Sequence, residues 1–257
     1  MSGTALITGA SAGIGQHLAR VFAANGHDLI LVARREEPML ALADELTGEY
    51  DVAIDVHSLD LSGPKAADHL FNALADTEVE ILVNNAGVLT GGRFHRMDPN
   101  AVDNMLTLNV QALTALCHRF APAMVARGHG RILNIASIAA FHPIPNLAVY
   151  AASKAYVLSL SEALSTELIN KGVSVTAVCP GYTDTEMLRG PVEASSGGIK
   201  IPDFTVLDPA RVAEDAYNAC MSGDAVKVPG LGYAATISAT RLLPKWLVRR
   251  ITRMASG

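Results

Sequence analysis

The chain has 257 residues, of which 50 % are hydrophobic and 18 % charged, and its mean hydropathy is +0.27. This composition excludes a disordered chain, and the length suits one compact α/β domain. Three cysteines without a Cys-x-x-Cys pair exclude a disulfide framework and a thiolate zinc site. The eight histidines have no metal-ligand spacing, so we expect no metal.

Charge is unevenly distributed along the chain. The net charge of −5 separates into −11 for residues 1–224, with 14 basic and 25 acidic side chains, and six basic side chains without an acid from residue 225 onward. Nucleic-acid binding is not expected, because phosphate contacts need clustered Lys and Arg. The N-terminal sequence lacks the regions of a signal peptide, and the longest segment without a charge, 132–153, contains two prolines. We therefore expect a cytoplasmic protein without a membrane span.

Short aliphatic segments alternate with longer helical stretches. The expected strands are 5–7, 29–33, 52–59, 81–83, 131–136, 173–179 and 225–228, and the expected helices are 16–25, 39–46 and 66–75. Strands that are apolar on both faces and alternate with helices indicate a parallel sheet covered on both sides. No repeat or linker marks a second domain, and the long irregular segment 186–208 is expected to be functional.

A glycine-rich turn follows the first expected strand. Gly9, Gly13 and Gly15 lie in the sequence TGASAGIG, and a helix is expected directly after it. Glycines let backbone N–H groups approach a pyrophosphate closely, and a helix N-terminus adds partial positive charge. The alternative is that these glycines only pack a helix against a strand.

Further motifs resemble, in order, those of the short-chain dehydrogenase/reductase family. The glycine spacing G-x-x-x-G-x-G is the variant that this family carries. The later motifs are Asn84-Asn85-Ala86-Gly87, Asn109 in LNVQA, Ser137 at a strand end, Tyr150-x-x-x-Lys154 and Pro180-Gly181. The resemblance covers residues 4 to about 187. It implies a Rossmann-type doubly wound parallel sheet of about seven strands, with the ligand at the carboxyl ends of the strands.

Tyr150 and Lys154 form the expected chemical centre. Four residues apart in a helix, they lie on one face. A phenol with a pKa of about 10 is a poor base at neutral pH, and a neighbouring ammonium group favours the phenolate. The resemblance implies that Tyr150 is the general acid/base and that Lys154 also binds the nicotinamide ribose. The alternative is a surface aromatic beside a solvated charge.

The resemblance assigns two more residues to catalysis. Ser137 is expected to polarise the substrate carbonyl, and Asn109 to hold a water in a proton relay toward Lys154. The alternative for Asn109 is a helix residue that bonds nearby backbone. A non-catalytic dinucleotide-binding sensor is the alternative to an enzyme, and the complete set of catalytic residue types argues against it.

The resemblance also implies which residues contact the cofactor. These are Gly9, Ser11, Gly13, Ile14, Gly15, Arg34, Asp60, Leu61, Asn85, Gly87, Tyr150, Lys154, Pro180, Gly181 and Thr183. Asp60 is expected at the adenine amino group, and its alternative is a position at a helix N-terminus.

Residues at the end of the second expected strand indicate whether NAD or NADP is preferred. Relatives that use NAD usually have an acid where this chain has Ala33, and Arg34 and Arg35 follow it. A guanidinium group suits the 2′-phosphate of NADP, so we expect NADP(H) rather than NAD(H). Ala12 departs from this pattern, because many NADP-linked relatives have a basic residue there. The arginines could alternatively begin a solvated helix.

Residues expected around the substrate are largely apolar. The resemblance places Leu89, Ala139 to His142, Tyr182 and the segment Glu186–Asp208 there. Their apolar side chains are Leu89, Phe141, Met187, Leu188, Ile199, Ile201 and Phe204. An apolar carbonyl or alcohol substrate is therefore expected, with His142 and Arg189 as the polar exceptions.

The C-terminal segment 241–257 combines a basic stripe with an apolar face. Basic residues recur at Arg241, Lys245, Arg249 and Arg253, beside an apolar set that contains Trp246. Such a helix suits an anionic membrane surface and a lipid-like substrate. We favour the alternative, in which the apolar face packs on the body or on a partner subunit of a homo-oligomer.

Overall fold

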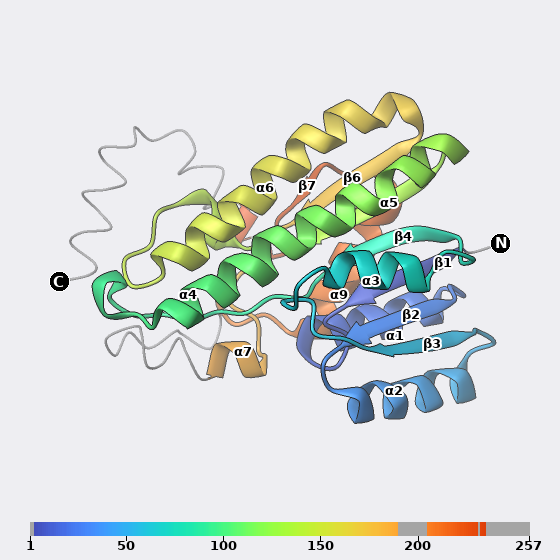
Figure 1. Cartoon of the computed structure of the whole chain (residues 1–257), viewed down its shortest axis with the longest axis horizontal. Coiled ribbons are helices and arrows are strands. Elements are labelled where there is room, and N and C mark those ends of the chain that lie inside the picture. Colours follow the sequence, from blue (N-terminus) through green and yellow to red (C-terminus); the bar gives the residue numbers. More distant parts are fainter. Residues whose placement is uncertain (1–2, 190–204, 231, 235–257) are drawn as a thin grey trace.

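The computed structural model describes residues 3–189, 205–230 and 232–234. Seven parallel strands form one sheet in the order β3-β2-β1-β4-β5-β6-β7 (Figure 1). The strands are β1 Thr4–Thr8, β2 Leu29–Ala33, β3 Ile54–Ser58, β4 Val79–Asn84, β5 Gly130–Ile135, β6 Val173–Val178 and β7 Val226–Lys227. The chain order reverses where β1 pairs with both β2 and β4, and this reversal opens a crevice at the carboxyl ends of the strands.

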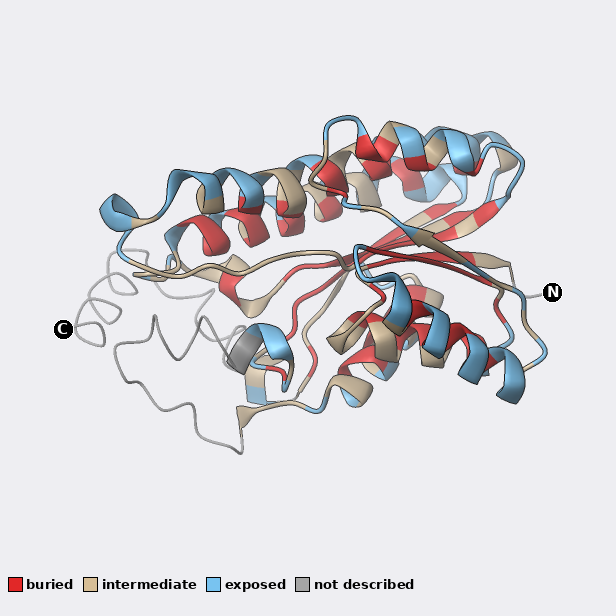
Figure 2. Ribbon diagram, turned by 60° about the horizontal axis from the view of Figure 1, so that its bottom comes forward, coloured by how far each residue is buried: buried red, intermediate tan, exposed pale blue. Residues whose placement is uncertain are grey.

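Helices cover both faces of the sheet. They are α1 Gly13–Ala24, α2 Glu36–Glu49, α3 Ala66–Ala73, α4 Pro99–Leu106, α5 Leu113–Arg127, α6 Ala148–Leu168, α7 Glu186–Arg189 and α9 Pro209–Ser222. Short helical segments are η1 Phe94–Arg96, η2 Thr107–Ala112, η3 Ile138–Phe141 and η4 Ile169–Lys171. One core contains buried residues of α3, α5 and α6, and another those of α1, α2 and α9. Figure 2 shows these buried helix faces turned toward the sheet.

The expected parallel sheet and its strands are confirmed. Strand β2 has the predicted bounds because its sequence, LILVA, is apolar and buried at every position. Helix α1 begins at Gly13, three residues before the prediction, because the glycine turn itself forms its first turn. Helix α2 begins at Glu36, since two acidic residues in the first turn suit its positive end.

Two predicted segments fall wholly or partly outside the described residues. The segment 186–208 begins with α7, and its last residue, Asp208, caps α9 by accepting from the Ala210 N–H at 3.0 Å. The basic segment 241–257 lies entirely outside the described residues. In the part of the chain that is described, no helix is both long and apolar enough to cross a membrane.

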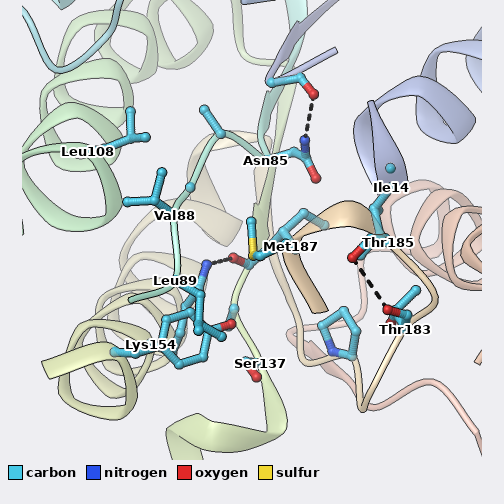
Figure 3. A pocket seen from close by; sticks show the side chains of 18 of the residues that line it. Ile14, Asn85, Val88, Leu89, Leu108, Ser137, Lys154, Thr183, Thr185 and Met187 are labelled. Carbon is cyan, nitrogen blue, oxygen red and sulfur yellow. Dashed lines mark hydrogen bonds between the residues drawn. The ribbon is translucent and has the colours of Figure 1, made fainter. Parts of the chain in front are cut away.

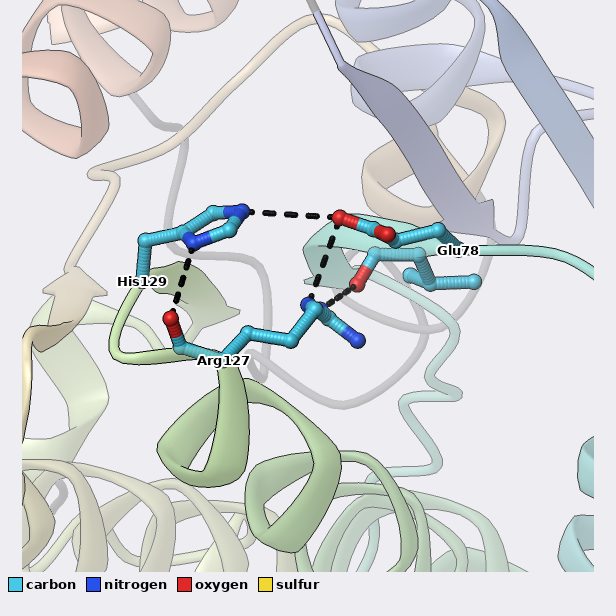
Figure 4. Close-up of polar contacts among 4 residues, drawn as sticks. Glu78, Arg127 and His129 are labelled. Atoms are coloured by element: carbon cyan, nitrogen blue, oxygen red, sulfur yellow. Dashed lines mark hydrogen bonds and ion pairs between the residues drawn. The ribbon is translucent and has the colours of Figure 1, made fainter.

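Polar contacts also fix the amino end of β4. At the end of α5, Arg127 donates from Nη2 to the Val79 carbonyl at 2.9 Å (Figure 4). Its Nε lies 3.3 Å from a Glu78 carboxylate oxygen, which His129 Nε2 approaches to 3.4 Å. These contacts join the end of α5 to the start of β4, at the opposite end of the sheet from the crevice.

A buried polar network attaches α6 to the middle of the sheet. Asn84 donates to Asn134 Oδ1 at 2.9 Å, and Asn134 donates to Ser161 Oγ at 2.9 Å. Ser161 in turn donates to the Val157 carbonyl at 2.7 Å. Burial raises the pKa of the neighbouring Cys117 thiol to about 12, so this side chain stays neutral. The network sets the position of α6 relative to β4 and β5.

Replacing the central member of this network should destabilise the fold. Asn134→Leu removes the oxygen acceptor of the buried Asn84 amide, which keeps only its weaker bond to Cys117 Sγ, and loss of a buried hydrogen-bond partner costs about 1–3 kcal/mol. Urea unfolding should show a loss of that size. Asn72→Leu, at an exposed position of α3, is the matched control. An unchanged free energy of unfolding for Asn134→Leu would refute the structural importance of the network.

Candidate active site

A cavity of about 870 Å³ lies at the carboxyl ends of the strands (Figure 3). The predicted site residues that line it are Gly9, Ser11, Gly13, Ile14, Arg34, Asp60, Leu61, Asn85, Gly87, Ser137, Tyr150, Lys154, Pro180, Gly181 and Thr183. The structure thus brings together residues spread over most of the chain. Among the predicted catalytic and cofactor-binding residues, Gly15 and Asn109 do not line the cavity.

The glycine turn is joined to the end of β4. Gly9 has φ +69°, and a Cβ there would lie 2.8 Å from Asn85 Nδ2. Thr8 Oγ1 accepts from the N–H groups of Asn85 and Ala86 at 3.0 Å each, and Asn85 donates to the Thr8 carbonyl at 2.9 Å. At Gly15 a Cβ would lie 2.2 Å from the Gly9 carbonyl oxygen, so close packing of α1 on the turn requires a glycine here, and a contact of Gly15 with the cofactor stays a prediction.

The start of α1 fits an anion. Its first turn contains no acidic residue, so nothing local offsets the partial positive charge of the helix N-terminus. Gly13 and Ile14 line the cavity there. A glycine cradle that a Cβ would fill, together with this helix end, fits the pyrophosphate of a dinucleotide.

Charged residues gather near the ends of β2 and β3. Arg34 and Arg35 are exposed at the cavity. Arg35 Nη2 lies 3.5 Å from a Glu186 carboxylate oxygen. Asp60 accepts from the Ser62 N–H and hydroxyl at 2.9 and 2.7 Å, and these bonds, with Arg34 nearby, lower the pKa of its carboxyl group. Because α3 begins only at Ala66, the helix N-terminal alternative for Asp60 was wrong.

Tyr150 and Lys154 lie on the cavity side of α6 and are buried. The Lys154 Nζ is 5.8 Å from the centre of the Tyr150 ring and donates to the Ile135 carbonyl at 2.8 Å. Only 9 % of Tyr150 and 6 % of Lys154 is exposed, so the surface-pair alternative was wrong. Burial lowers the pKa of Lys154 to about 8. Burial raises the pKa of Tyr150, and a hydrogen bond with Ser137 opposes that rise.

Ser137 is held by its own backbone turn. It caps η3, and its Oγ accepts from the Ala139 N–H at 3.1 Å. At neutral pH the arrangement therefore presents two hydroxyl donors, Ser137 and Tyr150, beside a buried ammonium group. Such donors can bond the oxygen of a carbonyl group and give it a proton.

Asn109 is buried in the π-helical segment η2 and bonds nearby backbone. Its Oδ1 accepts from the Val88 N–H and its Nδ2 donates to the Val88 carbonyl, both at 2.9 Å. The side chain thus takes the alternative role, and its part in a water relay stays a prediction. Gly87 lies between Asn109 and Lys154. A Cβ at Gly87 would be 3.2 Å from Asn109 Oδ1 and 3.6 Å from Lys154 Nζ.

The substrate end of the cavity is mainly apolar. Its lining includes Val88, Leu89, Leu108, Ile138, Ala139, His142, Pro143, Ile144, Leu147, Tyr182, Met187 and Tyr233. Burial lowers the pKa of His142, so the imidazole is neutral at pH 7. Phe141 was wrongly expected here, because it turns away and packs against the core formed with α3, α5 and α6.

Other expected substrate residues lie outside the part of the chain that the structure describes. They are Ile199, Ile201 and Phe204, together with the side chains of Leu188 and Arg189. Sequence reasoning missed several cavity residues, among them Val88 and Tyr233. Val88 directly follows the Asn-Asn-Ala-Gly motif, and this adjacency could have identified it. Tyr233 follows no motif, so no sequence signal indicated it. Within the described residues, no cluster of three or more His, Cys, Asp or Glu side chains could hold a metal ion.

Comparisons with known proteins agree with this geometry. The family model described as short chain dehydrogenase matches residues 3–195. Sulfoacetaldehyde reductase 2 of Chromohalobacter salexigens is 36 % identical over 221 residues, which cover 83 % of this chain and 86 % of that protein. A short-chain dehydrogenase from Sphingobium yanoikuyae in complex with NADPH is 36 % identical, with a TM-score of 0.83 and coverage of 93 % and 92 %.

A second solved structure resembles the chain to a similar degree. It is the bulky-bulky ketone specific alcohol dehydrogenase from Comamonas testosteroni, which is 34 % identical with a TM-score of 0.79. The match covers 93 % of this chain and 91 % of that one.

The buried position of Lys154 predicts an unusual titration. Nitrogen-detected NMR of the lysine Nζ groups should show one midpoint near 8, because burial disfavours the ammonium form. Lys154→Met should remove the low-pKa resonance. If every lysine titrates above 10, the ammonium group is not desolvated as the structure requires.

Proposed function

The chain belongs to the short-chain dehydrogenase family of oxidoreductases, and we propose that it transfers a hydride between NADP(H) and the carbonyl or alcohol group of an apolar substrate. The observation that carries this proposal is the buried group of Tyr150, Lys154 and Ser137 at the end of a cavity whose other end fits a dinucleotide. The full set of hydroxyl donors and a desolvated cation also supports an enzyme over a non-catalytic sensor.

In the reductive direction, the side chains donate a proton to the carbonyl oxygen and stabilise the negative charge that develops on it. The nicotinamide, when bound, supplies the hydride to the carbonyl carbon. Ser137 donates a hydrogen bond to the carbonyl oxygen, and Tyr150 gives that oxygen its proton. The Lys154 ammonium then stabilises the phenolate that Tyr150 becomes. The raised pKa of Tyr150 in the free protein suits this role, because the donor is protonated at neutral pH.

Cofactor preference rests on the residues at the end of β2. Ala33 offers no acceptor for a ribose 2′-hydroxyl, whereas Arg34 and Arg35 are exposed at the cavity. Of the two, Arg35 already lies near Glu186, so we assign the 2′-phosphate to Arg34. The NADPH complex of the Sphingobium relative supports this choice. Ala12 lines the cavity without contributing a charge.

An apolar, bulky carbonyl compound is the proposed substrate. The described side chains at the substrate end are mainly apolar: the charged ones are Lys154 and Glu186, whose carboxylate lies 3.5 Å from Arg35, and His142 is neutral at pH 7. Such a wall suits the bulky ketones named for the Comamonas relative better than a charged aldehyde such as sulfoacetaldehyde. The lipid-like substrate depends on residues 241–257, which are not described. The homo-oligomer and the cytoplasmic location stay predictions.

Removing the phenolic hydroxyl tests the chemistry. Tyr150→Phe keeps the ring but has no proton to give, so turnover of bulky ketones with NADPH should fall about 10²–10⁴-fold. Fluorescence titration should show that NADPH still binds. Tyr156→Phe, on the exposed side of α6, is the matched control. Near-normal turnover by Tyr150→Phe would sink the assignment.

Removing the arginine after β2 tests the cofactor preference. Arg34→Ala should weaken NADPH binding by about 1.5–3 kcal/mol, because a charged hydrogen-bond donor to the 2′-phosphate is lost. NADH binding should be nearly unchanged in calorimetry, since NADH has no such phosphate. Ala33→Asp should move the preference toward NADH. A wild-type protein that binds NADH more tightly than NADPH would contradict the proposal.

A further inference from the structure

The ring of Tyr233 covers the glycine of the Pro180–Gly181 turn. The backbone of Gly181 is not left-handed, yet a Cβ there would lie 2.2, 2.4 and 2.6 Å from three ring atoms of Tyr233. A side chain at position 181 is therefore excluded by the tyrosine ring and not by backbone strain. Tyr233 itself is half-buried and borders the cavity.

The hydroxyl of Tyr233 joins two other segments. It donates to the Thr205 carbonyl at 2.8 Å and lies 3.4 Å from the Tyr182 nitrogen, from which it accepts. Those two segments also bond each other, because the Leu207 N–H donates to the Tyr182 carbonyl at 2.7 Å. The turn after β6, the residues just before α9 and the chain beyond β7 thus meet at one phenol.

The same turn is attached to the catalytic end of the cavity. The Pro180 carbonyl accepts from the N–H of Ile138, the residue after Ser137, at 2.9 Å. Thr183 Oγ1 donates to the Gly181 carbonyl at 3.1 Å, which keeps the turn compact. A displacement of the Gly181 turn would therefore change the wall between Ser137 and Thr183.

We propose that Tyr233 is a positioning residue that holds the Pro180–Thr183 turn in the geometry that the nicotinamide ring requires. The inference rests on the proposed function, in which this turn receives the nicotinamide end of the cofactor. The ring packs against the backbone of Gly181, and the hydroxyl accepts from the amide of Tyr182. Arg34 and Asp60 lie at the end of the cavity assigned to the adenosine and its 2′-phosphate, which Tyr233 does not contact.

Two ligands separate this role from a general loss of structure. NADPH has a nicotinamide, and 2′-phospho-ADP-ribose has none. Tyr233→Ala should weaken NADPH binding about tenfold, a size common for coupled neighbours, and leave binding of 2′-phospho-ADP-ribose within about twofold. Tyr233→Phe, which keeps the ring over the turn and loses only the hydroxyl contacts, should fall between wild type and Tyr233→Ala.

A double-mutant cycle tests the contact itself. Gly181→Ala should also weaken NADPH selectively, because its Cβ meets the Tyr233 ring. In the Tyr233→Ala background, Gly181→Ala should cause no further loss of NADPH affinity, because the ring that the new Cβ would meet is absent. Tyr156→Phe, which removes a hydroxyl that Thr114 approaches to 3.0 Å outside the site, is the matched control and should leave both ligands unaffected.

The binding of NADPH and of 2′-phospho-ADP-ribose by these variants separates the positioning role from the proposed function. Variants at Tyr233 that weaken both ligands equally, or neither, overturn the positioning role, and so do additive losses in the double mutant. A wild-type protein that binds neither ligand overturns the proposed function, and the inference falls with it. Selective loss of NADPH in Tyr233→Ala together with non-additivity supports the proposal.

Discussion

A single buried ammonium group organises the cavity. Lys154 is almost completely buried and donates to the Ile135 carbonyl at 2.8 Å, at the carboxyl end of β5. Removing a charge from water is costly unless polar groups replace the solvent, and this carbonyl is one such group. The same desolvation brings the pKa of Lys154 down to about 8 and lets its charge act strongly on Tyr150 nearby.

The surrounding structure keeps that charge in place. Asn84, Asn134 and Ser161 bind α6 to the central strands through buried hydrogen bonds. Gly87 leaves room for the Asn109 amide beside Lys154, because a Cβ there would lie only 3.2 Å from Asn109 Oδ1. Asn109 bonds both the N–H and the carbonyl of Val88, and so fixes the residue that follows Gly87 in the cavity wall. The proton chemistry that we propose depends on all three contacts.

Local patterns predicted the sheet well, and long-range contacts explain what they missed. Strand β2 is aliphatic throughout because both its faces are buried, so its bounds were readable from the sequence. The glycine turn, the Asn-Asn-Ala-Gly motif, Ser137 and the Pro180–Gly181 turn meet because each lies at or just after the carboxyl end of a parallel strand, and α6 brings Tyr150 and Lys154 to the same edge. Phe141 and Tyr233 could not be predicted, since one turns into the core and the other depends on a contact with Gly181, far away in the chain. Asp60 was ambiguous until the start of α3 was known.

The central claim is that the Lys154 ammonium, with an oxidised cofactor bound, brings the Tyr150 phenol into the working pH range. The direct measurement is the Tyr150 titration by NMR of tyrosine labelled with ¹³C at Cζ, with Tyr150→Phe used to assign the resonance. Without cofactor, the pKa of Tyr150 should lie above its ordinary value, because burial disfavours the phenolate. With NADP⁺ it should fall well below that value, and in Lys154→Met it should not fall. A Tyr150 pKa that NADP⁺ leaves unchanged, or that falls equally in Lys154→Met, would contradict the account.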